Sequence, residues 1–220
     1  MMICPETFYE MRLKGKTQKE IMTVIRNLKR EIGHLKNIIE NPEYDSRELV
    51  IHPTEKVQIS MSREYLERAK QALIEAGGTY TPSKAEQRAA AFEDNIPYIK
   101  KVVFRIGGYF TGYTTKTYTI EDDKVHVDVE HSLIYDGPDS DNDKNCEWEK
   151  EEFLDQLDAL CIGEWRRKYD TKRFGWVVMD GTQWGLEIYY SNGRRAVKIN
   201  GDNAYPYNFD RVLELFEMED

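Results

Sequence analysis

The chain has 220 residues, of which 40% are hydrophobic and 12% aromatic, so it holds enough apolar material for one large or two modest packed domains. Its formal net charge is −9 at pH 7. No run approaches the roughly 18–20 apolar residues of a membrane span, and residues 1–10 lack a leader pattern, so we expect a cytoplasmic protein without a membrane contact. The widely separated Cys4, Cys146 and Cys161 predict free thiols rather than disulfides or a zinc site.

The charge is divided unevenly along the chain. Residues 1–95 carry 15 basic and 15 acidic residues, whereas residues 96–220 carry 16 basic and 25 acidic residues. Within the first part, Met11–Ile39 holds eight basic residues and only Glu20 and Glu31 as acids. A basic segment therefore precedes an acidic body, and such an asymmetry can orient a protein on a charged partner.

A long helix is predicted from Thr17 to about Glu40. Thr17 and Glu20 have the spacing of a capping box, in which two side chains satisfy free backbone amides at a helix start. Beyond them, apolar residues recur at alternating intervals of four and three, which is a heptad pattern: Ile21, Ile25, Leu28, Ile32, Leu35 and Ile39. Such a helix needs a partner along most of its length, either within the chain or in a homodimer.

The intrachain partner is predicted to begin at Ser62 and to end at Gly77-Gly78. Its apolar stripe has five members: Tyr65, Leu66, Ala69, Leu73 and Ala76. Between the two helices, Leu49–Ile51 and Val57–Ile59 alternate as the two strands of a small hairpin would.

A second capping box, Ser83 with Glu86, predicts a short helix to about Phe92. Pro97 follows and breaks the pattern, so we place the boundary between a helical domain, residues 1–95, and a second domain, residues 96–220.

The second domain opens with three strand-like segments: Val102–Ile106, Tyr109–Ile120 and Val125–Leu133. The third places its valines and His131 on one face and His126, Asp128 and Glu130 on the other. The polar stretch over residues 136–145 predicts a surface loop, and Trp148–Tyr169 has the apolar spacing of a helix.

The C-terminal part is predicted pair by pair from Asp180-Gly181 and Asn192-Gly193, which are typical of two-residue hairpin turns. The second turn sets Ile188 beside Val197, Leu186 beside Ile199, Tyr190 beside Arg195 and Glu187 beside Lys198. The first turn sets Val177 beside Trp184 and Trp176 beside Gly185, which completes a three-stranded antiparallel meander.

A last helix is expected to start at Asn208, as its N-cap, and to lie on that sheet through four apolar residues: Phe209, Val212, Leu213 and Phe216. The predicted fold class is therefore α+β: a helical N-terminal region with a small β-hairpin, followed by a mainly antiparallel sheet with two packed helices.

Two clusters of polar residues carry candidate chemistry. His126, Asp128 and Glu130 share one strand face and could divide acid and base roles or ligate a metal, although a solvated sheet face explains them better. A second cluster, Asp139, Asp141 and Asp143, imitates the start of a calcium loop, but Lys144 and Lys150 occupy positions that such a loop gives to Gly and Glu. We therefore predict no metal and no cofactor, and an acidic loop that can contact a basic protein.

Two further groups are candidates for binding. Lys19, Arg26, Lys29 and Arg30 belong to the basic segment and are either a solvated helix face or a contact for nucleic acid. Tyr205 and Tyr207 flank Pro206 and are either contacts for a partner protein or packing for the last helix.

Several stretches resemble a known group of proteins: Cys4-Pro-Glu-Thr-Phe-Tyr9 through His34-Leu35, Asp180-Gly-Thr-Gln-Trp184, Leu186-Glu-Ile-Tyr-Tyr-Ser-Asn-Gly193 and Gly201-Asp-Asn-Ala-Tyr-Pro-Tyr-Asn-Phe209. They are similar to parts of uncharacterised small proteins carried by gut Firmicutes and their phages or conjugative elements. The resemblance implies an accessory role, and a common accessory role in mobile elements is to block host defence, as anti-CRISPR proteins do by binding a nuclease. It implies no catalytic residue.

The leading expectation is a non-enzymatic binding protein that inhibits a nucleic-acid-handling host nuclease by occupying its surface. One alternative is a nucleic-acid-binding accessory protein that uses the basic helix. The other is a metal-dependent enzyme that uses His126, Asp128 and Glu130.

Overall fold

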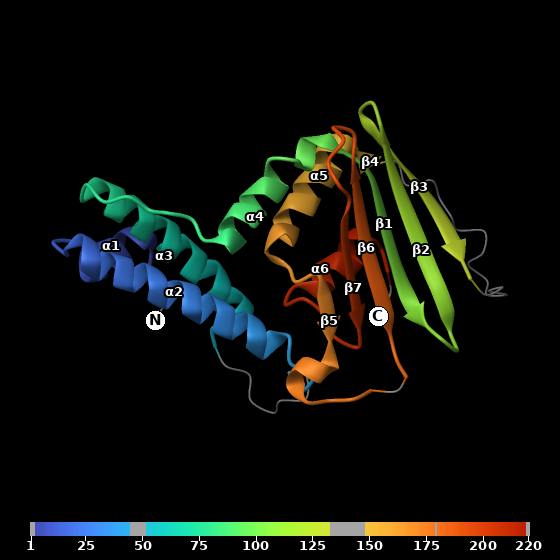
Figure 1. Ribbon diagram of the computed structural model, residues 1–220, viewed down its shortest axis with the longest axis horizontal. Coiled ribbons are helices and arrows are strands. Elements are labelled where there is room, and N and C mark those ends of the chain that lie inside the picture. The colour runs from blue at the N-terminus through green and yellow to red at the C-terminus, as the bar shows by residue number, and fades with distance from the viewer. Residues whose placement is uncertain (1–2, 45–51, 133–147, 179, 219–220) are drawn as a thin grey trace. The chain divides into compact units, whose positions relative to one another are not determined.

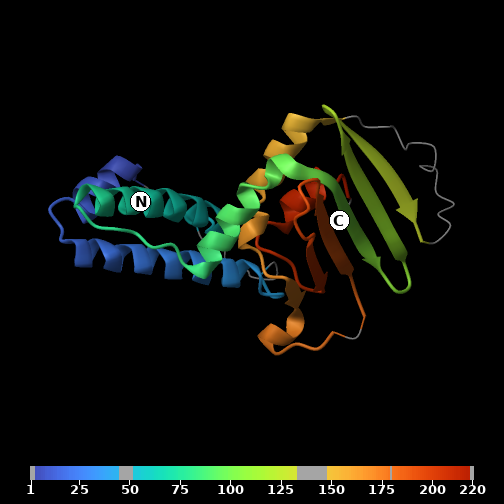
Figure 2. The same cartoon turned by 45° about the horizontal axis from the view of Figure 1, so that its top comes forward.

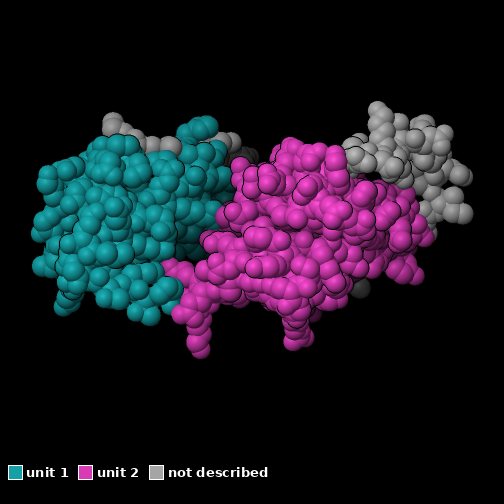
Figure 3. Space-filling model, turned by 90° about the horizontal axis from the view of Figure 1, so that it is seen from above, with its two compact units in different colours: residues 1–82 teal, residues 83–220 magenta. Residues whose placement is uncertain are grey.

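The computed structural model describes residues 3–44, 52–132, 148–178 and 180–218. The chain forms two compact units, Met1–Pro82 and Ser83–Asp220, which Figure 3 colours separately. The boundary thus precedes the short helix α4 (Lys84–Glu93), whereas the sequence placed it after Asn95. The reason is that Phe92 of α4 is buried in the hydrophobic core of the second unit.

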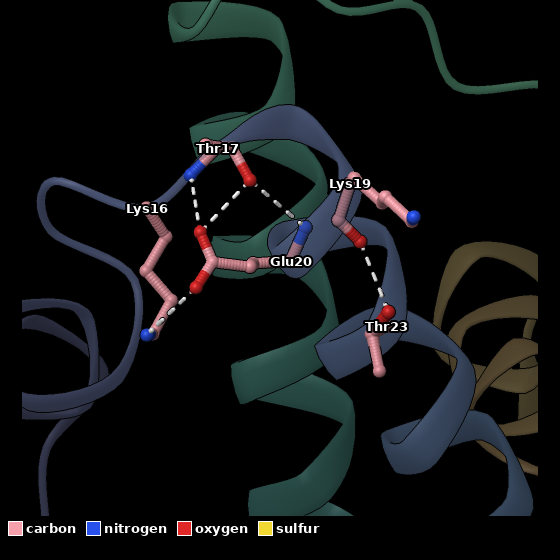
Figure 4. A network of polar contacts seen from close by, with 5 residues as sticks. All are labelled: Lys16, Thr17, Lys19, Glu20 and Thr23. Carbon is pink, nitrogen blue, oxygen red and sulfur yellow. Dashed lines mark hydrogen bonds and ion pairs between the residues drawn. The ribbon is translucent and has the colours of Figure 1, made fainter.

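The described residues of the first unit form three helices: α1 (Pro5–Arg12), α2 (Gln18–Ile39) and α3 (Glu55–Glu75). The predicted capping box is present at the start of α2, where the Glu20 carboxylate accepts hydrogen bonds from the Thr17 amide at 2.9 Å and its hydroxyl at 2.8 Å (Figure 4). The heptad residues Ile21, Ile25 and Leu28 are buried within the single chain.

Helix α3 runs antiparallel to α2, because the Gln18 side chain at the start of α2 donates a hydrogen bond of 2.8 Å to the Ala76 carbonyl at the end of α3. The end of α3 is as predicted: Gly77 has a positive φ of 73°, and the Gly78 amide donates to the Leu73 carbonyl at 2.9 Å. The intrachain partner predicted for the heptad helix is therefore present.

The predicted hairpin in this region is wrong at its second strand. Val57–Ile59 lies in the first turns of α3, while Leu49–Ile51 falls outside the described residues. Three apolar positions are too few to distinguish alternation from a helix. The helix is indicated by a longer pattern with intervals of three and four, whose members are buried: Ile59, Ser62, Leu66, Ala69 and Leu73.

The second unit is built on a seven-stranded sheet with the order β4-β3-β2-β1-β6-β7-β5 (Figure 1). All neighbouring pairs are antiparallel except β5 with β7, so the α+β class is confirmed. Its strands are β1 (Ile99–Gly108), β2 (Gly112–Glu121), β3 (Lys124–His131), β4 (Trp148–Glu149), β5 (Lys168–Asp170), β6 (Gln183–Tyr190) and β7 (Val197–Asp202). Its other helices are α5 (Lys150–Ala159) and α6 (Phe209–Leu215), with 3₁₀ turns at Ile96–Tyr98, Ile162–Glu164 and Thr171–Phe174.

Helices α5 and α6 cover one face of the sheet (Figures 1 and 2). Phe104 of β1 stacks on Phe216 just beyond α6 with 4.7 Å between ring centroids, and Tyr118 of β2 stacks on Phe153 of α5 at 5.1 Å. All four rings are buried. The last helix therefore lies on the sheet as predicted, although its N-cap residue Asn208 does not cap it through its side chain.

The predicted register of the last hairpin is confirmed. The strand ladder pairs Leu186 with Ile199, Glu187 with Lys198 and Ile188 with Val197, while Tyr190 and Arg195 lie beyond its paired part. Gly193 has a positive φ of 79°, but Asn192 lacks the positive φ that the predicted two-residue turn also requires, so the register is as predicted and the turn type is not.

The third strand of the predicted meander is wrong. Residues 176–178 form no strand, and the second neighbour of β6 is β1, which matches it over eight paired positions from Ile99 to Gly107. The predicted pairing of Trp176 with Gly185 is absent. A tryptophan does lie opposite a glycine elsewhere in the sheet, where Trp184 pairs with Gly201 of β7. A distant strand of ten residues offers β6 more apolar pairing than the short segment beside it.

The helix predicted for Trp148–Tyr169 is shorter than expected. Helix α5 ends at Ala159, and Cys161 adopts a left-handed conformation with φ 51°. The chain then passes close to α4, where a Cβ atom on Gly163 would stand 2.7 Å from the Ala89 Cα. This close approach explains why the apolar pattern continues through Trp165 while the helix does not.

Candidate functional site

The face of the sheet opposite α5 and α6 consists of side chains that alternate with the core residues, and we call it the outer face. Three rows cross its strands from β3 to β6 or β7: His126, Thr119, Lys101 and Tyr189; Asp128, Thr117, Val103, Glu187 and Lys198; Glu130, Thr115, Arg105, Gly185 and Asn200. Its side chains are exposed or half-buried, in contrast to the buried core face.

Two tyrosines of the outer face lie beneath cationic side chains. The Lys101 Nζ stands 4.7 Å from the centre of the Tyr189 ring, and the Arg105 Cζ stands 3.7 Å from that of Tyr113. The Tyr113 hydroxyl also donates a 2.7 Å hydrogen bond to the Gln183 side chain. These contacts hold the long side chains in fixed positions, which lowers the entropy lost when a ligand binds.

A charged pair crosses from β6 to β7 on the same face. The Glu187 carboxylate accepts hydrogen bonds from the Lys198 Nζ, at 2.7 Å, and from the Tyr189 hydroxyl. The hydrogen bond from Lys198 and then that from Tyr189 lower the pKa of Glu187, and the same carboxylate raises the pKa of Lys198. Both groups are therefore charged at neutral pH.

One end of the sheet carries exposed apolar side chains, which we call the end patch. Tyr109 and Phe110 occupy the β1–β2 turn, with 83% and 75% of their surface exposed, and Trp176, Val177 and Val178 precede β6. Both segments lie toward the end of the sheet at which β1 ends and β6 begins, in register at Gly107 and Gln183. Trp176 is held beside β5 at the edge of the sheet, where its amide donates a 3.2 Å hydrogen bond to the Thr171 carbonyl. The rings of Tyr109 and Phe110 meet edge to face at 5.1 Å.

The structure does not bring His126, Asp128 and Glu130 together as a metal site. Each lies opposite a threonine of β2, and alternate residues of a strand are about 7 Å apart. In the described part of the chain, no three His, Cys, Asp or Glu side chains form a group that could hold a metal ion. His131 is an exposed histidine near the end of β3, and its Nδ1 is hydrogen-bonded to the Thr114 hydroxyl at 3.1 Å.

The residues predicted to bind a protein partner have different surroundings. Asp139, Asp141 and Asp143 fall outside the described residues. Tyr207 is buried, with 7% of its surface exposed, and the Tyr205 ring packs on Phe209 at 4.6 Å. The geometry therefore favours the packing alternative for both tyrosines.

The basic residues of α2 divide into two sets. Lys19, Arg26 and Arg30 are exposed on the side of the helix opposite its buried residues. Lys29 instead turns toward Tyr80, whose hydroxyl it contacts at 3.2 Å. Three of the four predicted residues thus share a solvent-facing surface.

The sequence analysis missed Lys101, Arg105 and Tyr189 of the outer face and all of the end patch. A signal for the outer face exists in the alternation of polar and apolar residues over β1 and β6. It indicates which residues point outward from each strand. It does not indicate that the two strands are neighbours.

Comparisons of the chain with protein-family models, with curated proteins and with solved structures gave no match. Within the described ranges, no helix combines the length and the apolar character needed to cross a bilayer.

Proposed function

We propose that this protein is a non-enzymatic binding protein that acts by occupying the surface of a protein partner. The observation that supports the proposal is the end patch together with the mixed charges of the outer face beside it. Aromatic side chains such as Tyr109, Phe110 and Trp176 are enriched at the cores of protein interfaces, and neighbouring charges orient the partner.

The charge of the second unit favours a partner with a basic surface. Residues 83–220 contain 18 Lys and Arg against 28 Asp and Glu, and the acids Asp128 and Glu130 are exposed on β3. Enzymes that handle nucleic acids carry such basic surfaces. Together with the resemblance to accessory proteins of phages and mobile elements, this charge gives the specific form of the proposal: an inhibitor of a host defence nuclease, similar in role to anti-CRISPR proteins.

Capture of a defence nuclease by matched variants tests this proposal. The tagged chain is mixed with the nuclease after nucleic acid has been digested. The wild type should retain the nuclease, a variant with Phe110→Ser and Trp176→Ser should lose it, and a control with Met11→Ser and Ile74→Ser should keep it. Met11 and Ile74 are equally exposed apolar residues of the first unit. Equal capture by all three chains, or recovery of nucleic acid alone, would contradict the proposal.

The dose dependence of inhibition separates occupancy from catalysis. A protein that acts by occupancy should inhibit the nuclease in proportion to its amount and reach completion near equal molar amounts. Inhibition that is complete at a small fraction of that amount and grows with incubation time would identify an enzyme instead.

A second candidate function, nucleic-acid binding, is favoured by one observation: Lys19, Arg26 and Arg30 share the exposed side of α2. The affinity for DNA should then fall steeply with salt concentration. Changing the three residues to Gln should reduce the slope of the logarithm of the binding constant against the logarithm of the salt concentration by about one for each phosphate that the variant no longer binds. The control changes three exposed basic residues of the second unit, Lys100, Lys172 and Arg211, to Gln. An equal effect of both variants would show that only the overall charge matters.

A further inference from the structure

Three arginines from separate segments of the second unit lie near the end of β6, close enough for the charges of Arg88 and Arg194 to act on Arg167. Arg88 belongs to α4, Arg167 precedes β5, and Arg194 lies in the turn between β6 and β7. Arg88 donates hydrogen bonds to the carbonyls of Gly163, at 3.3 Å, and Trp165, at 3.4 Å.

Arg194 is held on the same helix, because its guanidinium donates to the carbonyl of Ala91, one turn beyond Arg88. Its Cζ stands 5.4 Å from the centre of the Tyr190 ring. Arg167 is anchored through its backbone, since its carbonyl accepts a 3.2 Å hydrogen bond from the Asn200 amide of β7. Its guanidinium forms no hydrogen bond within the described part of the chain, so all of its N–H groups can still donate to a ligand.

The positive charge of this cluster is not compensated. None of the three arginines forms an ion pair with a carboxylate among the residues that the structure describes. Burial, and then the charges of Arg88 and Arg194, lower the pKa of Arg167. Since an arginine stays protonated at neutral pH, the three groups repel one another.

Tyr190 lies among these cations with an unused hydroxyl group. Only 4% of its surface is exposed, and its hydroxyl oxygen is buried without a hydrogen-bond partner. Burial raises the pKa of the phenol, so it is neutral and keeps its proton to donate. A buried donor without an acceptor destabilises the folded chain, and an acceptor that reaches it removes this loss.

We propose that Arg88, Arg167, Arg194 and the Tyr190 hydroxyl form a binding site for a phosphate group. One tetrahedral oxyanion supplies negative charge to the guanidiniums and a hydrogen-bond acceptor to the phenol, and the cluster lacks both. Guanidinium groups match phosphate oxygens in pairs, and a dianion offsets the three charges better than a carboxylate does. Inorganic phosphate and a phosphomonoester share this chemistry.

The test measures unfolding of the full chain by tryptophan fluorescence, with and without inorganic phosphate or phenyl phosphate, at constant ionic strength. All four tryptophans lie in the second unit, so the signal reports on the unit that holds the site. The wild type should be stabilised in a saturable way. Arg167→Gln should weaken binding at least tenfold, and Tyr190→Phe should weaken it about threefold to tenfold.

Arg167→Gln also separates a ligand site from a structural role. Because it removes repulsion and no side-chain hydrogen bond, the unliganded variant should be at least as stable as the wild type, and only its response to phosphate should be lost. Arg211→Gln on α6 removes the same charge from an exposed position and should leave that response unchanged.

Tighter binding of phenyl phosphate would support a phosphorylated ligand at this site, and tighter binding of inorganic phosphate would support free phosphate. The proposal would be overturned by equal effects of Arg167→Gln and Arg211→Gln, by equal binding of acetate, or by a wild type that shows no saturable response.

Discussion

At the residue scale, Thr17 is the side chain whose role is most directly testable. Its hydroxyl accepts a hydrogen bond from the Glu20 amide, and the Glu20 carboxylate accepts one from the Thr17 amide (Figure 4). The same carboxylate forms an ion pair with Lys16 at 3.4 Å. Thr17→Ala should lower the free energy of unfolding of the first unit by about 1 kcal/mol, because it leaves a helix-terminal amide without its partner. Denaturant unfolding followed by far-UV circular dichroism measures the change.

Thr23 provides the matched control on the same helix (Figure 4). Its hydroxyl donates to the Lys19 carbonyl at 2.9 Å, inside the helix, where no amide depends on it. Thr23→Ala should therefore change the free energy of unfolding by less than about 0.5 kcal/mol, since alanine has the higher helix propensity. Equal losses for the two variants would refute the capping argument.

The pair of Glu187 and Lys198 makes stability depend on pH. Because the pKa of Glu187 is lowered in the folded chain, its contribution is present above the ordinary glutamate value of about 4.3 and is lost as pH falls through the lower folded value. Glu187→Gln should cost up to about 1 kcal/mol at pH 7 and less near pH 3. Urea unfolding at the two pH values tests this, and a difference that does not change with pH would contradict it.

At the element scale, the contact of β6 with β7 depends on a glycine. A Cβ atom on Gly201 would meet the Trp184 ring and stand 2.6 Å from the Ala204 carbonyl, which accepts the 2.9 Å hydrogen bond of the Trp184 indole. Gly201→Ala should therefore lower the free energy of unfolding of the second unit by about 1–3 kcal/mol. Urea unfolding followed by tryptophan fluorescence measures the loss.

Gly185 is the control within the same hairpin. The nearest atom to a Cβ placed there is the Ile199 carbonyl oxygen at 3.9 Å, an ordinary contact. Gly185→Ala should be neutral or slightly stabilising, since glycine weakens a strand by roughly 0.5–1 kcal/mol relative to alanine. If Gly185→Ala were as damaging as Gly201→Ala, crowding at Trp184 would not be the cause.

Elements that depend on neighbouring residues could be predicted from the sequence. Both capping boxes and the register at Asn192-Gly193 are local, because a few adjacent residues determine them. The β1–β6 pairing could not be predicted in this way. Several strands compete for each edge, and no residue near β6 indicates which one it joins.

The same limit applies to the candidate site. The sequence showed that His126, Asp128 and Glu130 face one way, but their neighbours are decided by β2, which presents threonines. Lys101 and Tyr189 meet only because β1 and β6 are adjacent. Side chains that converge from distant segments, such as Arg88 and Arg194, leave no pattern in the sequence.

At the scale of the whole molecule, the second unit has a core of its own. The buried cluster extends from Phe92 to Phe216 and contains none of the described residues of the first unit. Residues 83–220 expressed alone should therefore fold, with the same tryptophan emission as the full chain and a free energy of unfolding that agrees within about 0.5 kcal/mol. A shifted emission or an early, broad transition in the shorter chain would show that the second unit depends on the first.

The β1–β6 pairing also has a consequence for how the protein is made. A ribosome releases β1 while the segments that separate it from β6 are still to be synthesised, so one edge of β1 stays unpaired during that time. The apolar run Val102–Phe104 on this strand favours aggregation while it is exposed. Lys100 and Lys101 precede it and Arg105 follows it, and charges in these flanking places oppose association between nascent chains. Two of these cations, Lys101 and Arg105, later line the outer face, and they thus protect the strand before the sheet exists.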